Sequence, residues 1–448
     1  MTTASPLSAP PVPTRAEAFR YWLKLGFISF GGPAGQIAIM HEELVERRRW
    51  ISEGRFLHAL NYCMVLPGPE AQQLATYIGW LMHRTWGGVV AGGLFVLPSL
   101  LVLMALSYIY MRFGQVPAVA GVLYGIKPAV TAIVVSAAWR IGSRALRNAW
   151  LWGIAAAAFV AIFAFAVPFP AIVLVAALIG GIGGRVSPRT FQTGAGHASE
   201  DAARGAPAVI DHDTPTPPHA RFAWSRFAKV LIVFLAIWAV LIGALALRFG
   251  WHGALTQMGV FFTQAALLTF GGAYAVLPYV FQGAVEHYHW LTAPQMIDGL
   301  ALGETTPGPL IMVVAFVGFV GGWGQAVFGP EALAASAALG ATVATVFTFL
   351  PSFLFILLGG PFLESTHGNL KFTAPLSAIT AAVVGVIVNL AVFFALRVLW
   401  PDGYAGRFDW VSALIGLGAG VALFRYRVGV IPVILGCGLA GLAARMFA

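Results

Sequence analysis

Long apolar runs separated by short polar breaks cover most of this 448-residue chain. A helix needs about 20 apolar residues to cross a bilayer. Nine runs approach or exceed that length: 86–111, 117–139, 149–166, 168–184, 229–248, 332–360, 374–397, 410–424 and 428–446. Four further apolar stretches are interrupted by Gly and Pro. The pattern predicts an all-α polytopic membrane protein with about nine full spans plus four broken segments, up to 13 hydrophobic segments in all.

One long segment, residues 185–226, departs from this pattern because it is polar, charged and rich in Pro and Gly. Such a segment cannot bury enough apolar area to fold alone. We therefore divide the chain into four parts: a disordered N-terminal tail (1–16), a first repeat (17–184), a polar linker (185–226) and a second repeat with one extra span (227–448).

The two apolar halves carry the same short motifs in the same order. The first half holds Ser29-Phe30-Gly31-Gly32, Trp50 and Pro67-Gly68-Pro69. Adding 240 to each number reaches Thr269-Phe270-Gly271-Gly272, Trp290 and Pro307-Gly308-Pro309. Leu97-Pro98-Ser99 matches Leu350-Pro351-Ser352 after a short insertion. Three anchors in register indicate an internal duplication.

Charge orients the two copies differently. Arg47-Arg48-Arg49 precedes Trp50, whereas His287-Tyr288-His289 precedes Trp290 with no Lys or Arg nearby. Cytoplasmic loops are enriched in Lys and Arg, so the first loop is expected inside the cell and its copy outside. The extra span at 229–248 would produce this inversion, and inverted repeats are typical of secondary transporters. The N-terminus and the linker are then cytoplasmic.

Composition supports a membrane protein and removes other classes. Hydrophobic residues make up 59% and charged residues 10% of the chain, against about 25% charged in soluble proteins. The net charge of +9 is explained by basic cytoplasmic loops, so we expect no nucleic-acid partner. Cys63 and Cys437 lie in apolar stretches and form no metal-ligand pattern. We expect no metal, no cofactor and no nucleotide loop, and hence no enzyme.

The broken segments are the best candidates for a binding site. Pro-Gly-Pro and Gly-Gly interrupt a helix, and the backbone groups they free must be satisfied by protein or by a water-filled cavity. Breaks at matching places in both halves point to a site near the middle of the membrane. The alternative is that they are kinks for close helix packing. Basic flanks on both sides favour re-entrant hairpins over full crossings.

A helix that begins just after such a break points its free N–H groups and positive dipole end into the cavity. Neutral donors beside four such ends suit one small anion. The predicted anion-binding residues are Gly31, Gly32, Pro33, Gln36, Pro67, Gly68, Pro69, Gln72, Gln73, Lys127, Gly271, Gly272, Thr305, Thr306, Pro307, Gly308 and Pro309.

Three charges stand inside or beside apolar stretches. Lys127 lies within the run 117–139, where a charge costs about 3 kcal/mol on insertion scales; it is either functional or reaches to the interface. Glu70 and Glu304 flank the Pro-Gly-Pro breaks. Either acid could pair with Lys127, cap helix N–H groups or carry a proton. We take both as proton-coupling candidates.

The motifs resemble the chromate ion transporters of bacteria, in their long two-domain form. The resemblance rests on FGGPAGQIAIMHEELVERRRWIS (30–52), LPGPEAQQLATYIGWLMHRTWGG (66–88), FGGAYAVLPYV (270–280) and ETTPGPLIMVVAFVGF (304–319). It implies a multi-pass inner-membrane protein that exports chromate, driven by the membrane potential or the proton gradient, and so confers chromate resistance.

Sulfate shares the charge and shape of chromate, and we expect it to compete. Alternatives are an exporter of sulfate or another small anion, a membrane-embedded enzyme and a passive anion channel. Apart from the lipid bilayer and the anion, a second copy of the chain in a homodimer is a partner that the sequence leaves open.

Overall fold

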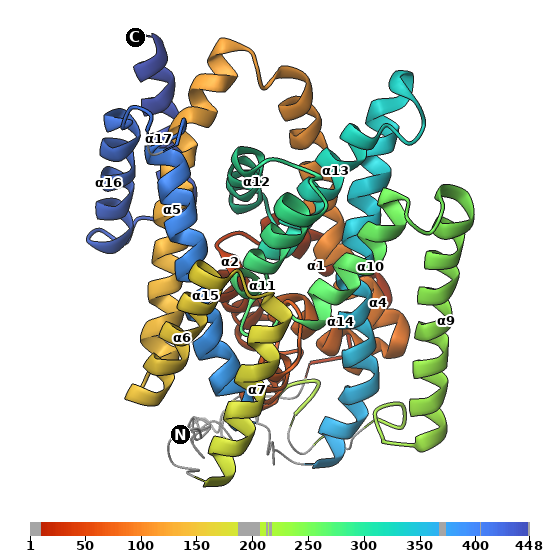
Figure 1. Cartoon of the computed structure of the whole chain (residues 1–448). Helices are drawn as coiled ribbons and strands as arrows, with labels where there is room; N and C mark the ends of the chain where they lie inside the picture. The colour runs from red at the N-terminus through yellow and green to blue at the C-terminus, as the bar shows by residue number, and fades with distance from the viewer. Residues whose placement is uncertain are drawn as a thin grey trace, which may run out of the picture.

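The computed structural model describes residues 10–186, 207–211, 214, 217–366, 373–403 and 405–446. These residues are almost entirely helical (Figure 1), which confirms an all-α polytopic membrane protein. Six helices are long and apolar enough to cross a membrane: α4 (Glu70–Phe113), α5 (Pro117–Ala145), α7 (Phe169–Val186), α9 (Trp224–Phe249), α14 (Leu333–Thr366) and α15 (Thr373–Leu399).

Shorter apolar helices accompany them: α6 (Ala149–Phe165), α13 (Val313–Gln325), α16 (Trp410–Phe424) and α17 (Val430–Met446). α6, α16 and α17 have only 15 to 17 residues, fewer than a straight crossing needs. α6 pairs with α7, and α16 with α17, through short loops. The predicted number of about nine full spans stays a prediction.

The duplication is visible in the backbone. The first half contains α1 (Arg15–Ile28), α2 (Gly32–His41), a π-helical turn η1 (Glu42–Arg47) and α3 (Glu53–Val65). The second half repeats the series as α10 (Ala254–Leu267), α11 (Ala273–Phe281), η3 (Gln282–His287) and α12 (Ala293–Thr305). Both π-turns are followed by a left-handed residue with φ 52°, Arg49 and His289. Such matching irregularities show that both halves fold the repeated sequence in the same way.

Each Pro-Gly-Pro break leads into two helices that pack against each other. In the first half one helix begins at Glu70, and non-helical backbone at His83 and Arg84 separates it from a second helix that ends at Phe113; α4 denotes both. A Cβ on Gly92 would stand 2.2 Å from the Thr76 hydroxyl oxygen, so the chain folds back at this point, and residues 86–111 lie in a helix of their own. In the second half the corresponding path consists of η4 (Leu310–Met312), α13, η5 (Pro330–Ala332) and α14.

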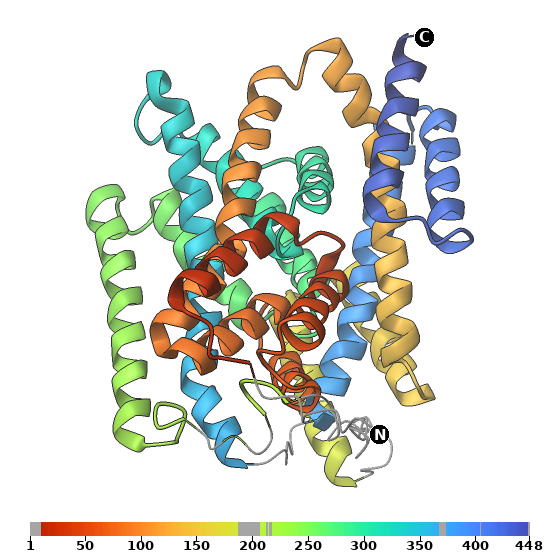
Figure 2. The same cartoon turned by 180° about the vertical axis from the view of Figure 1, so that it is seen from behind.

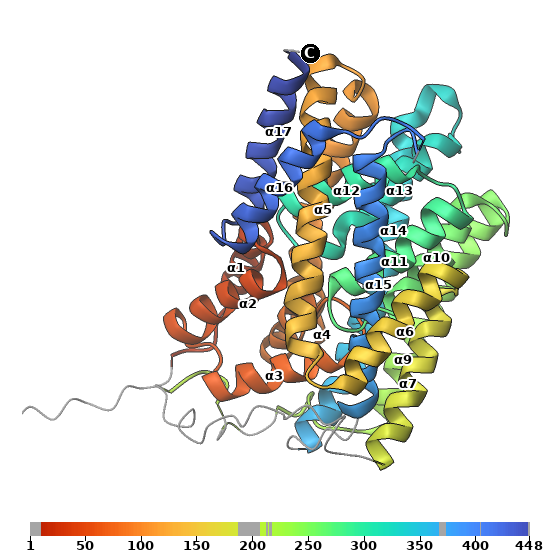
Figure 3. The same cartoon turned by 60° about the vertical axis from the view of Figure 1, so that its left-hand side comes forward.

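The first repeated hairpin consists of α2, η1 and α3, and the second consists of α11, η3 and α12. Their last helices, α3 and α12, lie toward opposite ends of the molecule. Figure 3 shows α3 near the end that holds the N-terminal segment, and α12 toward the end that holds the C-terminus. α5 runs between these two ends. Figure 2 shows the same separation from behind, with α9 standing at the outer edge of the helices. α9 is almost wholly exposed, and Ile242 is its one buried residue.

Close helix contacts hold the bundle together. A Cβ on Gly318 of α13 would stand 2.3 Å from the carbonyl oxygen of Gly340 of α14. A Cβ on Gly125 of α5 would stand 2.0 Å from the carbonyl oxygen of Cys437 of α17. Small residues at such contacts let helix backbones approach each other, which is how helices associate in lipid. The first contact joins α13 to α14, and the second joins α5 to α17.

Part of the linker packs against the first hairpin. Ile210 forms a parallel bridge with Ile51, and its backbone N–H donates to the carbonyl of Trp50 at 3.1 Å. The His219 Nε2 lies 2.9 Å from the carbonyl oxygen of Trp80, and Ala220 is fully buried. The described linker residues thus gain their order from the hairpin, as their composition requires, since they have no core of their own.

Candidate functional site

The four breaks meet in two crossed pairs. The Gly68 N–H donates to the carbonyl of Thr269 at 2.8 Å, and the Gly308 N–H donates to the carbonyl of Ser29 at 2.8 Å. Each Pro-Gly-Pro of one half therefore satisfies its freed backbone on the Gly-Gly break of the other half. This explains how interrupted backbone is tolerated at this depth.

Glycine is required at the centre of both Pro-Gly-Pro breaks. Gly68 has φ 128° and Gly308 has φ 99°, values that L side chains rarely adopt. A Cβ on Gly68 would stand 2.6 Å from Ser352 Oγ, and one on Gly308 would stand 2.7 Å from Ser99 Cβ. Ser99 and Ser352 occupy matching places in the two halves, so each break is covered by the long helix of the opposite half.

The predicted neutral donors are largely used within the protein. The Gln36 amide donates to the carbonyl of Gly308 at 2.5 Å, and the Gln73 amide donates to Pro67 at 2.8 Å. Gln72 donates to the Thr76 hydroxyl at 3.0 Å. The amide oxygens of these three side chains are buried without a hydrogen-bond partner. A role of these residues in anion binding stays a prediction.

The two threonines before the second Pro-Gly-Pro also bond locally. The Thr305 hydroxyl donates to the carbonyl of Leu302 at 2.9 Å, and the Thr306 hydroxyl donates to Gly303 at 3.0 Å. Their hydroxyls thus end α12 by bonding its own last turn. They stand beside the break without presenting a spare hydrogen to it.

A cavity of about 900 Å³ reaches the first Gly-Gly break from the side of α5. The break lines it with Gly31, Gly32 and Pro33, at the N-terminus of α2. A Cβ on Gly32 would meet nothing within 4 Å, so the backbone there faces open space. The polar and charged lining comes from α5, α11, α12 and the α16–α17 loop: Ser136, Arg140, Ser143, Arg144, Tyr274, Glu304 and Arg427.

The cavity carries more positive than negative charge. Arg140, Arg144 and Arg427 line it together with one carboxylate, Glu304, which accepts a hydrogen bond from the Tyr274 hydroxyl at 2.5 Å. The free N–H groups of a helix N-terminus add a partial positive charge. The three arginines are exposed, and their guanidinium groups beside a helix end suit a small oxyanion.

The two acidic candidates occupy different surroundings. Glu304 lines the cavity, whereas Glu70 is not among the lining residues. The Glu70 carboxylate lies at the second Gly-Gly break, 3.5 Å from where a Cβ on Gly272 would stand. One oxygen of Glu70 is buried without a hydrogen-bond partner. Gly271, which precedes Gly272 in the chain, lies next to Thr380 of α15.

Lys127 lies outside the cavity lining and is paired with a residue that we did not select from the sequence. Its Nζ lies 3.7 Å from Oδ2 of Asp298, on α12. The Tyr110 hydroxyl donates to the same carboxylate oxygen at 3.0 Å. The lysine therefore faces Asp298, and neither Glu70 nor Glu304 is its partner.

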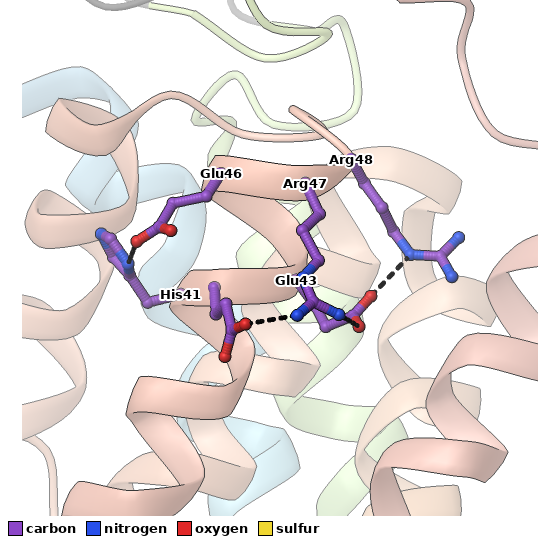
Figure 4. A network of polar contacts seen from close by, with 6 residues as sticks. His41, Glu43, Glu46, Arg47 and Arg48 are labelled. Carbon is purple, nitrogen blue, oxygen red and sulfur yellow. Dashed lines mark hydrogen bonds and ion pairs between the residues drawn. The ribbon is translucent and has the colours of Figure 1, made fainter.

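Two of the three arginines at the tip of the first hairpin form ion pairs (Figure 4). Arg47 lies 2.6 Å from Glu42 and 3.2 Å from Glu43, and Arg48 lies 3.2 Å from Glu43. His41 lies 3.2 Å from Glu46. The third arginine, Arg49, has a buried Nη1 without a hydrogen-bond partner, and none of the three lines the cavity.

Comparison with known proteins matches this arrangement to one family. The family model described as "Chromate transporter" matches residues 16–182 and 256–442, one match in each half. The chain belongs to the chromate transporter family. This confirms the resemblance seen in the motifs and, with the apolar helices, identifies a multi-pass membrane protein.

Named relatives extend over nearly the whole chain. A chromate transport protein from Pseudomonas aeruginosa is 34% identical over 98% of this chain and 95% of its own length. One from Cupriavidus metallidurans is 30% identical over 99% and 96%. A probable chromate transport protein from Synechococcus elongatus is 27% identical over 91% and 89%. No solved structure matches this chain.

The arginines that line the cavity were not selected from the sequence. Arg140 and Arg144 follow the expected span 117–139 and suggest a loop, but α5 continues to Ala145. With Ser136 and Ser143 they lie at positions i, i+4, i+7 and i+8, which share one helix face. That spacing was the available signal. Arg427 could not be found this way, because only the folded α16–α17 loop brings it to the first break.

Proposed function

We propose that this protein is a secondary active transporter that exports chromate from the cytoplasm across the inner membrane, driven by the membrane potential or the proton gradient. Membership of the chromate transporter family supports the substrate, as do the chromate transport proteins at 34% and 30% identity. Export of chromate would confer resistance to it. The observation that carries the mechanism is the basic cavity that ends at the first Gly-Gly break.

The proposed anion site combines Arg140 and Arg427 with the N-terminus of α2 at Gly31, Gly32 and Pro33. Charge-assisted hydrogen bonds from guanidinium groups are about twice as strong as neutral ones. They can satisfy the oxygens of a tetrahedral anion from several sides. The other break residues, from Gln36 and Pro67–Gln73 to Thr305–Pro309, hold the two halves together behind it.

The cavity is proposed to open to the cytoplasm. Arg140 and Arg144 lie near the end of α5 that shares the α3 side of the molecule (Figure 3). The basic residues of the first hairpin tip and of the linker belong to that side as well, and basic loops remain cytoplasmic. The positions of α3 and α12 at opposite ends support inverted repeats and a cytoplasmic N-terminus. An exporter in this conformation is ready to load.

Electrostatics favours movement outward. One charge that moves across 100 mV changes free energy by about 2.3 kcal/mol. A dianion leaving a negative cell interior therefore gains about 4.6 kcal/mol per 100 mV before any exchange with protons. Glu304 lines the same cavity as the arginines and accepts a hydrogen bond from the Tyr274 hydroxyl. We propose Glu304 as the proton-coupling residue because it is the one carboxylate among the lining residues.

Sulfate export is the second candidate because sulfate has the same charge and shape as chromate. Inside-out membrane vesicles separate the candidates. With a membrane potential or a pH gradient, labelled chromate should accumulate against its gradient, and unlabelled sulfate should reduce the rate. Accumulation of sulfate but not chromate would favour the second candidate. Equilibration without accumulation would indicate a passive channel and contradict active transport.

A further inference from the structure

Seven ion pairs join described residues, and they divide into two groups. Five lie within the first hairpin, around its charged tip. The remaining two join one half of the chain to the other. In the first, Arg55 Nη2 lies 2.7 Å from Oε2 of Glu364. In the second, Lys127 Nζ lies 3.7 Å from Oδ2 of Asp298.

Both cross-half pairs attach to the same repeated element. Arg55 lies on α3, the helix that leads into the first Pro-Gly-Pro. Asp298 lies on α12, which leads into the second. Each of these helices is bonded to the opposite half: α3 to the end of α14, and α12 to α5. The two pairs are thus related by the duplication, although different residues provide the charges.

A tyrosine of α4 reinforces each pair. The Tyr77 hydroxyl donates to the second oxygen of Glu364, and the Tyr110 hydroxyl donates to Asp298. The acid side chains are buried, with Glu364 1% and Asp298 4% exposed. Removing one partner of a buried ion pair is strongly destabilising, because the other charge is left uncompensated. These contacts are therefore closed in the present conformation and costly to open.

The helices that carry Arg55 and Asp298, α3 and α12, lie toward opposite ends of the molecule (Figure 3). We propose that Arg55–Glu364 and Lys127–Asp298 are two latches that hold the hairpins against the opposite half, and that each is released only when the protein opens at its own end. This rests on the proposed transport function, which requires the anion to be released on one side after loading on the other. It also gives Lys127 a role as a positioning residue outside the anion site.

The duplication supplies a matched pair of reporters. Cys63 lies on α3 and is fully buried. Its counterpart 240 positions later is Gly303, which is buried on α12. A Cβ on Gly303 would lie 3.5 Å from Val313 Cβ, an ordinary contact, so a cysteine fits there. Alkylation of these thiols by a maleimide measures how often each hairpin leaves its place.

The experiment compares two reporter proteins in membranes, both carrying Cys437→Ala. One retains Cys63, and the other carries Cys63→Ala and Gly303→Cys. We expect Arg55→Gln to accelerate alkylation at Cys63 about tenfold, since a buried charge loses its partner, and to leave position 303 unchanged. Asp298→Asn should accelerate alkylation at position 303 and leave Cys63 unchanged. Reversing the first pair, with Arg55→Glu and Glu364→Arg together, should restore slow alkylation at Cys63.

Two results would overturn the proposal. Acceleration of both thiols by each variant would mean general loosening of the fold. Unchanged alkylation in all variants would mean that the pairs hold nothing. If Arg55→Gln does not fold, Glu364→Gln tests the same latch from the other side. The assay contains no substrate, so loss of chromate uptake in vesicles and failure of the latches are separate results.

Discussion

Two cavities that have corresponding walls, one on α5 and one on α15, differ sharply in charge. The first, at the Gly31–Gly32 break, has Ser136, Arg140 and Ser143 on its α5 wall. The second, of about 230 Å³, is bordered by α6, α11, η3 and α15. The offset of 253 that aligns Pro98 with Pro351 places three residues of α15 on its wall at the same positions: Asn389, Phe393 and Leu396.

The loops that close the two cavities show the same divergence. Arg427 in the α16–α17 loop and Ala166 in the α6–α7 loop share a left-handed conformation, with φ 53° and 49°. One lines the first cavity and the other lines the second. The duplication therefore preserved the backbone and lost or never acquired the cations on one side. Where Arg140 and Arg427 line the first cavity, Phe393 and Ala166 line the second.

The comparison teaches that a duplicated backbone can carry different charges in its two halves. Helix ends and breaks exist in both halves, yet of these two cavities only the first is lined by arginine. The second cavity is lined by Glu286 with the neutral amides Gln282 and Asn389. Under the proposed export function, this difference would attract the anion on the loading side and not hold it on the other.

The largest effect is expected where the halves are alike. Gly68→Val and Gly308→Val should each abolish transport. A branched side chain at positive φ strains the backbone by about 1–3 kcal/mol. Its insertion into an occupied contact costs about 1–3 kcal/mol more. Chromate uptake in vesicles measures this, with the amount of protein in the membrane as reference. Gly243→Val, on α9 with no neighbour within 4 Å, is the matched control. Normal chromate uptake by either variant would contradict the claim that the paired breaks are needed for transport.

The next effect should appear only in the first cavity. Arg140→Phe copies the residue of the second cavity, and we expect chromate uptake to fall tenfold or more, since a hydrogen bond to a charged group contributes about 1.5–3 kcal/mol. Arg397→Phe is the control, because Arg397 lies on α15 outside the lining of either cavity. An equal loss in both variants would remove the distinction between the two cavities.

A change in coupling should follow replacement of the acid in the first cavity. In Glu304→Gln, uptake driven by the membrane potential should persist, while a pH gradient should add nothing. Initial rates with each driving force applied alone provide the measurement. Glu331→Gln, an exposed acid of the second half, should behave as the unmodified protein. Proton-dependent uptake that survives in Glu304→Gln excludes Glu304 as the coupling residue.

The smallest effect concerns the linker, whose His219 packs on the first half at Trp80. Burial lowers the pKa of His219, although its contact with the Trp80 carbonyl acts in the opposite direction. Because the docked imidazole binds its proton less readily than a free one, docking is complete above the ordinary pKa of about 6.5 and weakens as the pH falls below it. Limited proteolysis between residues 207 and 226 should therefore become faster near pH 5.5 than at pH 7.5. His219→Gln should lose this pH dependence.

Much of the fold could be predicted from sequence because its determinants are local. Apolar runs, the linker and the repeated Gly-Gly and Pro-Gly-Pro motifs indicate helices, breaks and duplication directly. The extent of individual helices was less accessible, since α5 carries Arg140 and Arg144 beyond the apolar run that marks a span. The reversal of the chain between Glu70 and Phe113 falls at His83 and Arg84, which are neither Gly nor Pro and so give no local sign of a break.

The site was only partly predictable. The Gly-Gly and Pro-Gly-Pro breaks do meet, as their matching positions suggest, and Gly31, Gly32 and Pro33 line the basic cavity. Gln36 and Gln73, selected as anion donors, instead bond backbone carbonyls across or within the breaks. No spacing rule indicates that Lys127 faces Asp298, 171 positions away. Such contacts follow from the crossing of two halves and become visible only in three dimensions.

The central claim is that the basic cavity of the first half, and not its counterpart, holds the anion. A cryo-electron microscopy structure of the protein with chromate tests this most directly, because chromium scatters strongly enough to mark the ligand. The account predicts one density beside Arg140 and Arg427, at the N-terminus of α2. Density beside Asn389 and Phe393 in the second cavity, or at the Gly68–Thr269 crossing, would contradict it.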